Sequence, residues 1–177
     1  FLLIINLTTS AYGVDAILTT SKKTNYKGIS KASTESYIQN SLPYDYRAIE
    51  WIRENIEKDK IILECTNLGN SYSNSSRIST FTGNPTVLGW SYHEWIWRAN
   101  QDHSMPKEVK NRTEDIKTVY TSTNISNIKD IINKYNISYI YIGEVEFKTY
   151  ENINIDFLKT LGDTIYEYGN TYIIKVK

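Results

Sequence analysis

The sequence has one cysteine, one methionine, two histidines and three prolines among its 177 residues. A single cysteine, Cys65, excludes an intramolecular disulfide and a cysteine-based zinc site. Cys65 follows the apolar run Ile61–Leu63, so we interpret it as a buried structural thiol rather than a reactive one. The chain therefore has little material for thiol or metal chemistry.

Net charge and long apolar runs are also absent. Basic and acidic residues balance at 20 each, so there is no basic field and we expect no nucleic-acid partner. The run Phe1–Ile5 is apolar, but a bilayer span needs about 20 such residues. It is either the end of a preceding transmembrane helix or a first strand. No other segment is apolar enough to span a membrane, so we expect the rest of the chain to be soluble.

Familiar catalytic and cofactor motifs are missing as well. The sequence contains no GxGxxG, P-loop or G-x-S-x-G pattern, so we predict no cofactor and no catalytic residue within this chain. His93-Glu94 invites comparison with zinc proteases, whose second histidine stands four residues after the first. That position is Trp97, and His103 lies ten residues after His93. We therefore predict no metal site.

Hydrophobic spacing predicts an α/β fold. Helices are predicted over residues 43–57, 105–120, 124–135 and 154–161, with a short helical turn at His93–Arg98. Strands are predicted over residues 60–65, 86–90, 138–143, 164–168 and 171–176. Gly169-Asn170 fits a two-residue hairpin turn between the last two strands. The predicted architecture is a mixed, partly parallel sheet flanked by helices, with a C-terminal antiparallel hairpin.

The same pattern divides the chain after residue 6 into two parts. Residues 7–42 are polar and weakly periodic, which predicts an irregular lead-in to a single α/β domain over residues 43–177. Within that domain, Thr66–Asn84 is rich in Asn, Ser and Gly and predicts a long loop, which is typical of a functional or mobile segment.

Residues 76–98 have the most unusual composition. Three of the four tryptophans fall within eight positions of one another, beside two arginines, a histidine and a glutamate. One interpretation is a tryptophan-rich local core with an Arg–Glu ion pair. The other is a binding site, with arginines for an anion such as phosphate and tryptophans for a sugar, a lipid or a membrane interface. The candidate binding residues are Arg77, Trp90, His93, Glu94, Trp95, Trp97 and Arg98.

This segment, SRISTFTGNPTVLGWSYHEWIWR, resembles the signature of the DUF2298 or "YYY" family of multi-pass membrane proteins of archaea and some bacteria. DYRAIEWIREN followed by IILEC is similar to a helix and strand of that family, and SYIYIGEVEFKTY is similar to a later strand and its Glu-x-x-x-Tyr. The likeness extends over residues 37–176. The family commonly has Leu at Asn84 and Gly or Pro at Tyr92, so these two positions depart from its pattern.

The family resembles the GT-C glycosyltransferases, which transfer a sugar from a polyprenyl-phosphate carrier. The resemblance implies that the catalytic acid lies outside this chain, in the membrane portion. It makes residues 1–6 the stub of the last transmembrane helix and the rest a soluble domain on the extracytoplasmic side of the cell membrane. The expected partners are the protein's own transmembrane region, the membrane surface and a lipid-phosphate-linked sugar.

Under this hypothesis, Arg77 and Arg98 would face phosphate, His93 and Glu94 would orient polar groups, and the tryptophans would stack or anchor. The first alternative is a structural or protein-interaction domain of an uncharacterised membrane protein, and the second is an independent enzyme. Asn-x-Ser/Thr sequons at Asn6, Asn74, Asn111, Asn124 and Asn136 permit an extracytoplasmic location but do not establish it, because this composition produces several by chance.

Overall fold

The computed structural model describes residues 12–16, 18, 34–67, 73–99 and 101–177. The chain divides into two compact units, Phe1–Ser41 and Leu42–Lys177. The predicted stub at residues 1–6 lies outside the described residues. Within the predicted lead-in, Thr34–Ser41 is a helix, α2. Among the described residues, no helix has the length and apolar character needed to cross a bilayer.

The second unit is a mixed α/β domain, as the sequence predicts. Its strands form one sheet in the order β1-β2-β4-β3. β1 and β2 pair in parallel, while β4 pairs antiparallel with both β2 and β3. In chain order the elements are α3 (Pro43–Asn55), β1 (Ile61–Leu63), α4 (Arg77–Thr82), α5 (Ser91–Arg98), α6 (Lys107–Thr121), α7 (Ile125–Tyr135), β2 (Ile137–Ile142), α8 (Glu144–Thr149), α9 (Ile155–Lys159), β3 (Gly162–Tyr168) and β4 (Thr171–Val176).

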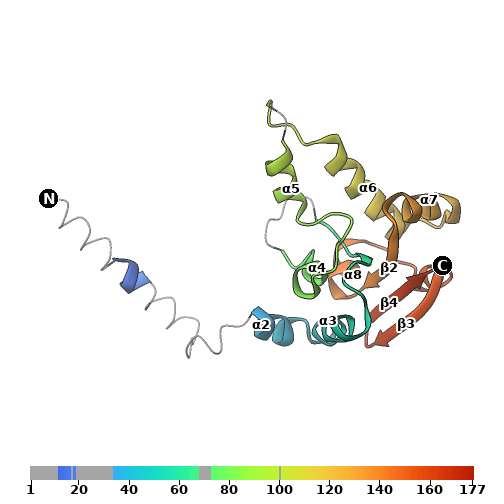
Figure 1. Cartoon of the computed structure of the whole chain (residues 1–177), viewed down its shortest axis with the longest axis horizontal. Coiled ribbons are helices and arrows are strands. Elements are labelled where there is room, and N and C mark those ends of the chain that lie inside the picture. The colour runs from blue at the N-terminus through green and yellow to red at the C-terminus, as the bar shows by residue number, and fades with distance from the viewer. Residues whose placement is uncertain (1–11, 17, 19–33, 68–72, 100) are drawn as a thin grey trace. The chain divides into compact units, whose positions relative to one another are not determined.

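Helices cover both faces of the sheet (Figure 1). Because side chains alternate along a strand, Ile140 and Ile142 face one side and Tyr141 faces the other. Ile140 and Ile142 join the core cluster that includes Ile116 of α6 and Ile128 of α7. Helix α3 packs on the sheet at β3 and β4 and buries Ile49 and Ile52. The sheet is therefore the middle layer of three.

The C-terminal hairpin forms where the sequence predicts it. β3 and β4 pair from Tyr168 and Thr171 at the turn to Gly162 and Val176 at the other end, with a register shift between Thr164 and Tyr166. Gly169 takes φ +58°, the left-handed conformation that a tight hairpin turn requires and that glycine adopts without steric cost.

Two segments differ from the prediction. Thr86–Trp90 is not a strand. Its neighbour Pro85 accepts one hydrogen bond from the Ile62 amide of β1 at 3.0 Å, but proline has no N–H to donate in return. The predicted loop Thr66–Asn84 contains the helix α4, which ends at Gly83 with φ +79°. Both segments lie next to the candidate site.

Candidate functional site

Arg77, one of the two arginines predicted to face phosphate, lies inside the protein. The residue is 2% exposed. Its Nε and Nη2 donate to Asp45 Oδ1 at 2.8 and 2.5 Å, and its Nη1 and Nη2 donate to the Glu146 carboxylate at 3.2 and 2.7 Å. The Tyr141 hydroxyl also donates to Asp45 Oδ1, at 2.5 Å. We call Asp45, Arg77, Tyr141 and Glu146 the buried cluster.

Ion pairing sets the protonation states of the buried cluster. Burial raises the pKa of the Glu146 carboxyl, but the charge and hydrogen bonds of Arg77 outweigh it, so the net shift is downward. Burial likewise opposes the charge of Arg77, yet Glu146, Tyr141 and Asp45 together raise its pKa well above the usual value. The guanidinium and the Glu146 carboxylate are therefore both charged at neutral pH.

The sheet leaves no room for a side chain beside this cluster. Gly143 follows β2, and a Cβ placed on it would lie 2.6 Å from Asp45 Oδ1 and 3.0 Å from Arg77 Nη2. Those separations are below van der Waals contact, so only glycine lets the ion pairs approach the backbone this closely. The glycine of the SYIYIG strand therefore has a packing role.

A third buried acidic side chain holds the start of α4. Glu64 accepts hydrogen bonds from the Ile78 and Ser79 amides at 2.8 Å each. Burial raises the pKa of the Glu64 carboxyl to about 7, against the lowering effects of Arg77 and the two amides. Glu64, the residue after β1, thus supplies the N-terminal cap that α4 lacks in its own sequence.

The buried cluster occupies the carboxyl ends of the parallel strands β1 and β2, where Glu64 follows Leu63 and Gly143 follows Ile142. Open α/β sheets commonly bind their ligands at this edge. Here the position is filled by ion-paired side chains of the protein itself. The phosphate-binding role of Arg77 stays a prediction, and the contacts of its guanidinium give it a structural role.

The aromatic residues of the signature gather on α5 and the residue before it. The rings of Trp90 and His93 are 5.7 Å apart, and those of His93 and Trp97 are 5.9 Å apart. Spacings of three and four residues place these rings in a row along one side of the helix. Trp90 Nε1 donates to the Ser75 carbonyl at 2.8 Å, which fixes the start of the row.

A second group of apolar side chains on α5 meets solvent. Trp97 is 81% exposed and Ile96 is 54% exposed. Tyr92 and Trp95 pack edge to face with ring centroids 5.7 Å apart. Tyr92, Trp95 and Ile96 line a shallow hollow of about 200 Å³ with Ala99 and His103. We call Tyr92, Trp95 and Ile96, together with the exposed Trp97 of the row on the other side of the helix, the aromatic face of α5.

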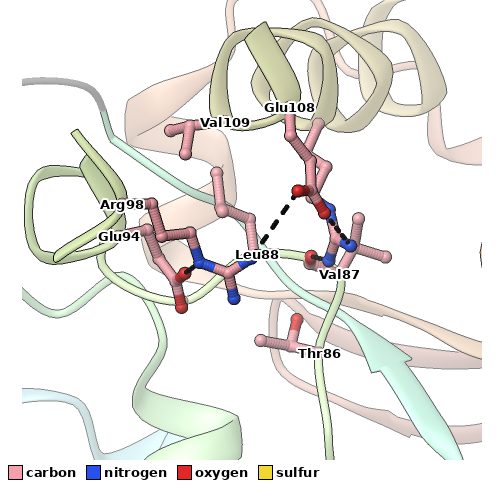
Figure 2. Close-up of a pocket in the computed structure, with 9 residues that line it drawn as sticks. Thr86, Val87, Leu88, Glu94, Arg98, Glu108 and Val109 are labelled. Carbon is pink, nitrogen blue, oxygen red and sulfur yellow. Dashed lines mark hydrogen bonds and ion pairs between the residues drawn. The ribbon is translucent and has the colours of Figure 1, made fainter. Parts of the chain in front are cut away.

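Arg98, the other predicted phosphate ligand, is accessible. It is 51% exposed by side chain and pairs with Glu94 at 2.7 Å and with Glu108 of α6 at 3.6 Å. Arg112 pairs with Glu108 at 2.6 Å and donates to the Val87 carbonyl at 2.7 Å. Figure 2 shows Glu94, Arg98 and Glu108 around a cavity that Arg112 also lines and that has a volume of about 170 Å³. We call this cavity the Arg98 pocket.

The Arg98 pocket has polar groups that a ligand could use. Its two arginines and two glutamates balance in charge and form a chain of ion pairs. Thr86 Oγ1, in the pocket lining, is buried and has no hydrogen-bond partner among the described residues. Exposed ion pairs contribute about 0–1 kcal/mol to stability. A ligand could therefore replace the Glu94–Arg98 pair at small energetic cost.

The structure thus brings six of the seven predicted residues onto or next to α5 and separates Arg77 from them. Glu108, Arg112 and Thr86 are pocket residues that sequence reasoning missed. Glu108 and Arg112 have i,i+4 spacing on a predicted helix, which indicates an ion pair. Nothing in the sequence places that pair next to Arg98. Among the described residues, no group of three His, Cys, Asp or Glu side chains could hold a metal ion.

Comparison with known proteins finds a likeness in structure. No protein-family model matches the chain, and no curated protein matches it. The chain is structurally similar to the C-terminal globular domain of an oligosaccharyltransferase from Archaeoglobus fulgidus, with a TM-score of 0.43 and 12% sequence identity, over 74% of this chain and 95% of that one. The resemblance of residues 76–98 to the DUF2298 family stays a prediction.

Proposed function

We propose that this chain is the extracytoplasmic domain of a GT-C-like membrane glycosyltransferase. It helps to bind a polyprenyl-phosphate-linked sugar at the membrane surface, and the catalytic acid belongs to the membrane portion of the protein. The observation that carries the proposal is the exposed aromatic face of α5, which lies directly beside the half-exposed Arg98. The resemblance of residues 76–98 to the DUF2298 signature supports it, because that segment contains the whole of α5.

The aromatic face suits a membrane interface. Exposing large apolar side chains to water costs about 25 cal/mol per Å², so Trp97 and Ile96 gain free energy when a lipid or protein surface covers them. Tryptophan and tyrosine are enriched where headgroups meet acyl chains, since their rings are amphipathic. Tyr92, Trp95 and Trp97 provide three such rings within one short helix.

The Arg98 pocket suits the polar part of a lipid-linked sugar. Arginine binds phosphate through two parallel hydrogen bonds, and Arg98 needs only to release its exposed contact with Glu94 to do so. Glu94, Glu108 and Thr86 Oγ1 could then accept or donate hydrogen bonds to sugar hydroxyls. In this role the pocket binds and orients the donor, and Arg77 contributes by holding α4 in place.

The alternative, a structural or protein-interaction domain, is favoured by one observation. The hollow of about 200 Å³ on α5 is lined by apolar and aromatic side chains and could receive a side chain from the protein's own transmembrane region. In that case the aromatic face mediates docking, and Arg98 has no part in sugar transfer.

A sugar-transfer assay on the full-length membrane protein separates the two functions. We expect Arg98→Ala to raise KM for the lipid-linked donor about tenfold, since a hydrogen bond to a charged group contributes about 1.5 kcal/mol. The pocket would contact the phosphate of the carrier equally in the bound ground state and in the transition state, so kcat should change little. His93→Ala in the same assay tests whether the row of rings formed by Trp90, His93 and Trp97 contributes to binding.

The matched control is Lys148→Ala, which removes an exposed cation with the same i,i+4 pairing to a glutamate on α8. It should leave KM unchanged. If Arg98→Ala and Lys148→Ala behave alike while both proteins are folded, the binding function is wrong and the docking alternative is supported.

A further inference from the structure

The sequons of this chain differ sharply in structure. Four of them, at Asn74, Asn111, Asn124 and Asn136, lie in the described residues. An oligosaccharide can be attached to asparagine only where the Asn-x-Ser/Thr tripeptide is accessible on the surface. The exposure of the three residues of each sequon therefore decides which of them can be modified in the folded domain.

Three sequons are held by the fold. Ser75 and Ser76 after Asn74 are both buried. The Asn111 sequon lies within α6, where the buried Thr113 hydroxyl donates to the Val109 carbonyl at 2.9 Å. After Asn136, the buried Ile137 opens β2 and pairs with Ile61 of β1.

The Asn124 sequon is open along its whole length. Asn124, Ile125 and Ser126 are all exposed, and Ile125 keeps 46% of its surface accessible. Asn124 Oδ1 accepts a hydrogen bond from the Asn127 amide at 3.2 Å and caps α7. This bond uses the oxygen of the side-chain amide and leaves Nδ2, the atom that receives a sugar, directed away from the cap.

The position of Asn124 is also compatible with the Arg98 pocket. The pocket contains Glu108 and Arg112, from the first two turns of α6, while Asn124 follows the last turn of that helix. At 1.5 Å per residue, the helix runs about 20 Å from Glu108, and about 14 Å from Arg112, to its last residue, Thr121. Asn111 is adjacent to Arg112, and Asn136 follows Tyr135, whose ring lies 5.6 Å from the Arg112 guanidinium. A glycan at either of those positions would crowd the pocket.

We infer that Asn124 is an N-glycosylation site of this protein. The inference rests on the proposed extracytoplasmic location, because the donor, a lipid-phosphate-linked oligosaccharide, is used on that side of the membrane. Asn124 Nδ2 forms a bond to the anomeric carbon of the sugar while the bond from that carbon to the phosphate oxygen breaks. The lipid phosphate leaves with the electron pair, and the amide proton passes to solvent.

Intact-mass and glycopeptide mass spectrometry of the full-length protein, purified from its native host, tests this inference. We expect the peptide that contains Asn124 to show the mass increase of one glycan. Asn124→Asp removes the acceptor nitrogen but keeps an oxygen that caps α7, and Ser126→Ala leaves the cap untouched. Both variants should lose the mass increase, whereas Asn111→Asp and Asn136→Asp should retain it.

Protease treatment of intact cells distinguishes failure of this inference from failure of the proposed location. A domain that external protease cleaves but that carries no glycan at Asn124 contradicts this inference and leaves the proposed function standing. A glycan at Asn111 or Asn136 in place of Asn124 contradicts it as well. A domain that external protease cannot reach overturns the extracytoplasmic location and, with it, both proposals.

Discussion

Arg77 and Arg98 belong to one sequence segment that predicts the same role for both, yet the fold places them in opposite environments. Arg77 is sealed between two carboxylates with a side chain 1% exposed, and Arg98 meets solvent with half of its side chain accessible. A buried ion pair is costly to break because the remaining charge is left without water. An exposed pair exchanges partners readily. The first arrangement suits a scaffold and the second suits binding.

The largest expected effect comes from removing the buried charge. Arg77→Met should destabilise the chain by about 3–5 kcal/mol, because Asp45 and Glu146 would stay buried without their partner. Arg98→Met makes the same chemical change in the exposed pocket and should cost less than about 1 kcal/mol. Urea denaturation of both variants measures the difference. If both variants lost the same free energy of unfolding, the assignment of a structural role to Arg77 alone would be wrong.

The next effect is the pH dependence that Glu64 confers. Its pKa in the folded chain, about 7, is raised from 4.5, chiefly by burial. Stability from this group is therefore fully present below pH 4.5 and is lost as the pH rises through 7, by about 3 kcal/mol in total. The urea concentration at the denaturation midpoint of the wild type should therefore decrease as the pH is raised from 5 to 8.

Glu64→Gln is the control for that titration, because glutamine keeps the shape of the side chain and does not ionise. Its stability should vary less between pH 5 and 8 than that of the wild type. Parallel pH profiles for the two proteins would show that another group titrates in this range. Arg98 variants should keep the wild-type profile, since their pocket lies apart from Glu64.

The sequence predicts the periodic elements well because their causes are local. The isoleucines of α7 repeat with helical spacing. The capping residue of this helix, Asn124, directly precedes it in the sequence and bonds to the amide of Asn127, three residues later. The Gly169-Asn170 turn is equally local. These signals account for the mixed sheet and the terminal hairpin, both of which are confirmed.

The parts that the sequence does not predict depend on partners distant in the chain. Helix α4 has no capping side chain of its own and relies on Glu64, which follows the preceding strand. The burial of Arg77 depends on Asp45 and Glu146, which stand 32 and 69 residues away. Arg112 reaches the Arg98 pocket only because α6 packs against α5. Residue type alone therefore made the two arginines look equivalent.

The smallest expected effect sharpens the same contrast. In a double-mutant cycle with Arg98→Ala and Glu94→Ala, the coupling energy should be about 0.3–0.5 kcal/mol, as for other exposed i,i+4 pairs. Salt at 1 M should weaken it further, because the screening length then falls to about 3 Å. The measurement is urea denaturation of the four proteins at low and high salt.

The coupling energy could instead be well above 1 kcal/mol and persist at high salt. The Arg98–Glu94 pair would then be as strong as a partly buried ion pair. A phosphate would then have to break that contact before it could bind, and the affinity of the pocket would fall by about tenfold for every 1.4 kcal/mol. A weak pair has the opposite consequence. Glu94 keeps the guanidinium extended in the free protein and yields it to a ligand that forms two hydrogen bonds with it.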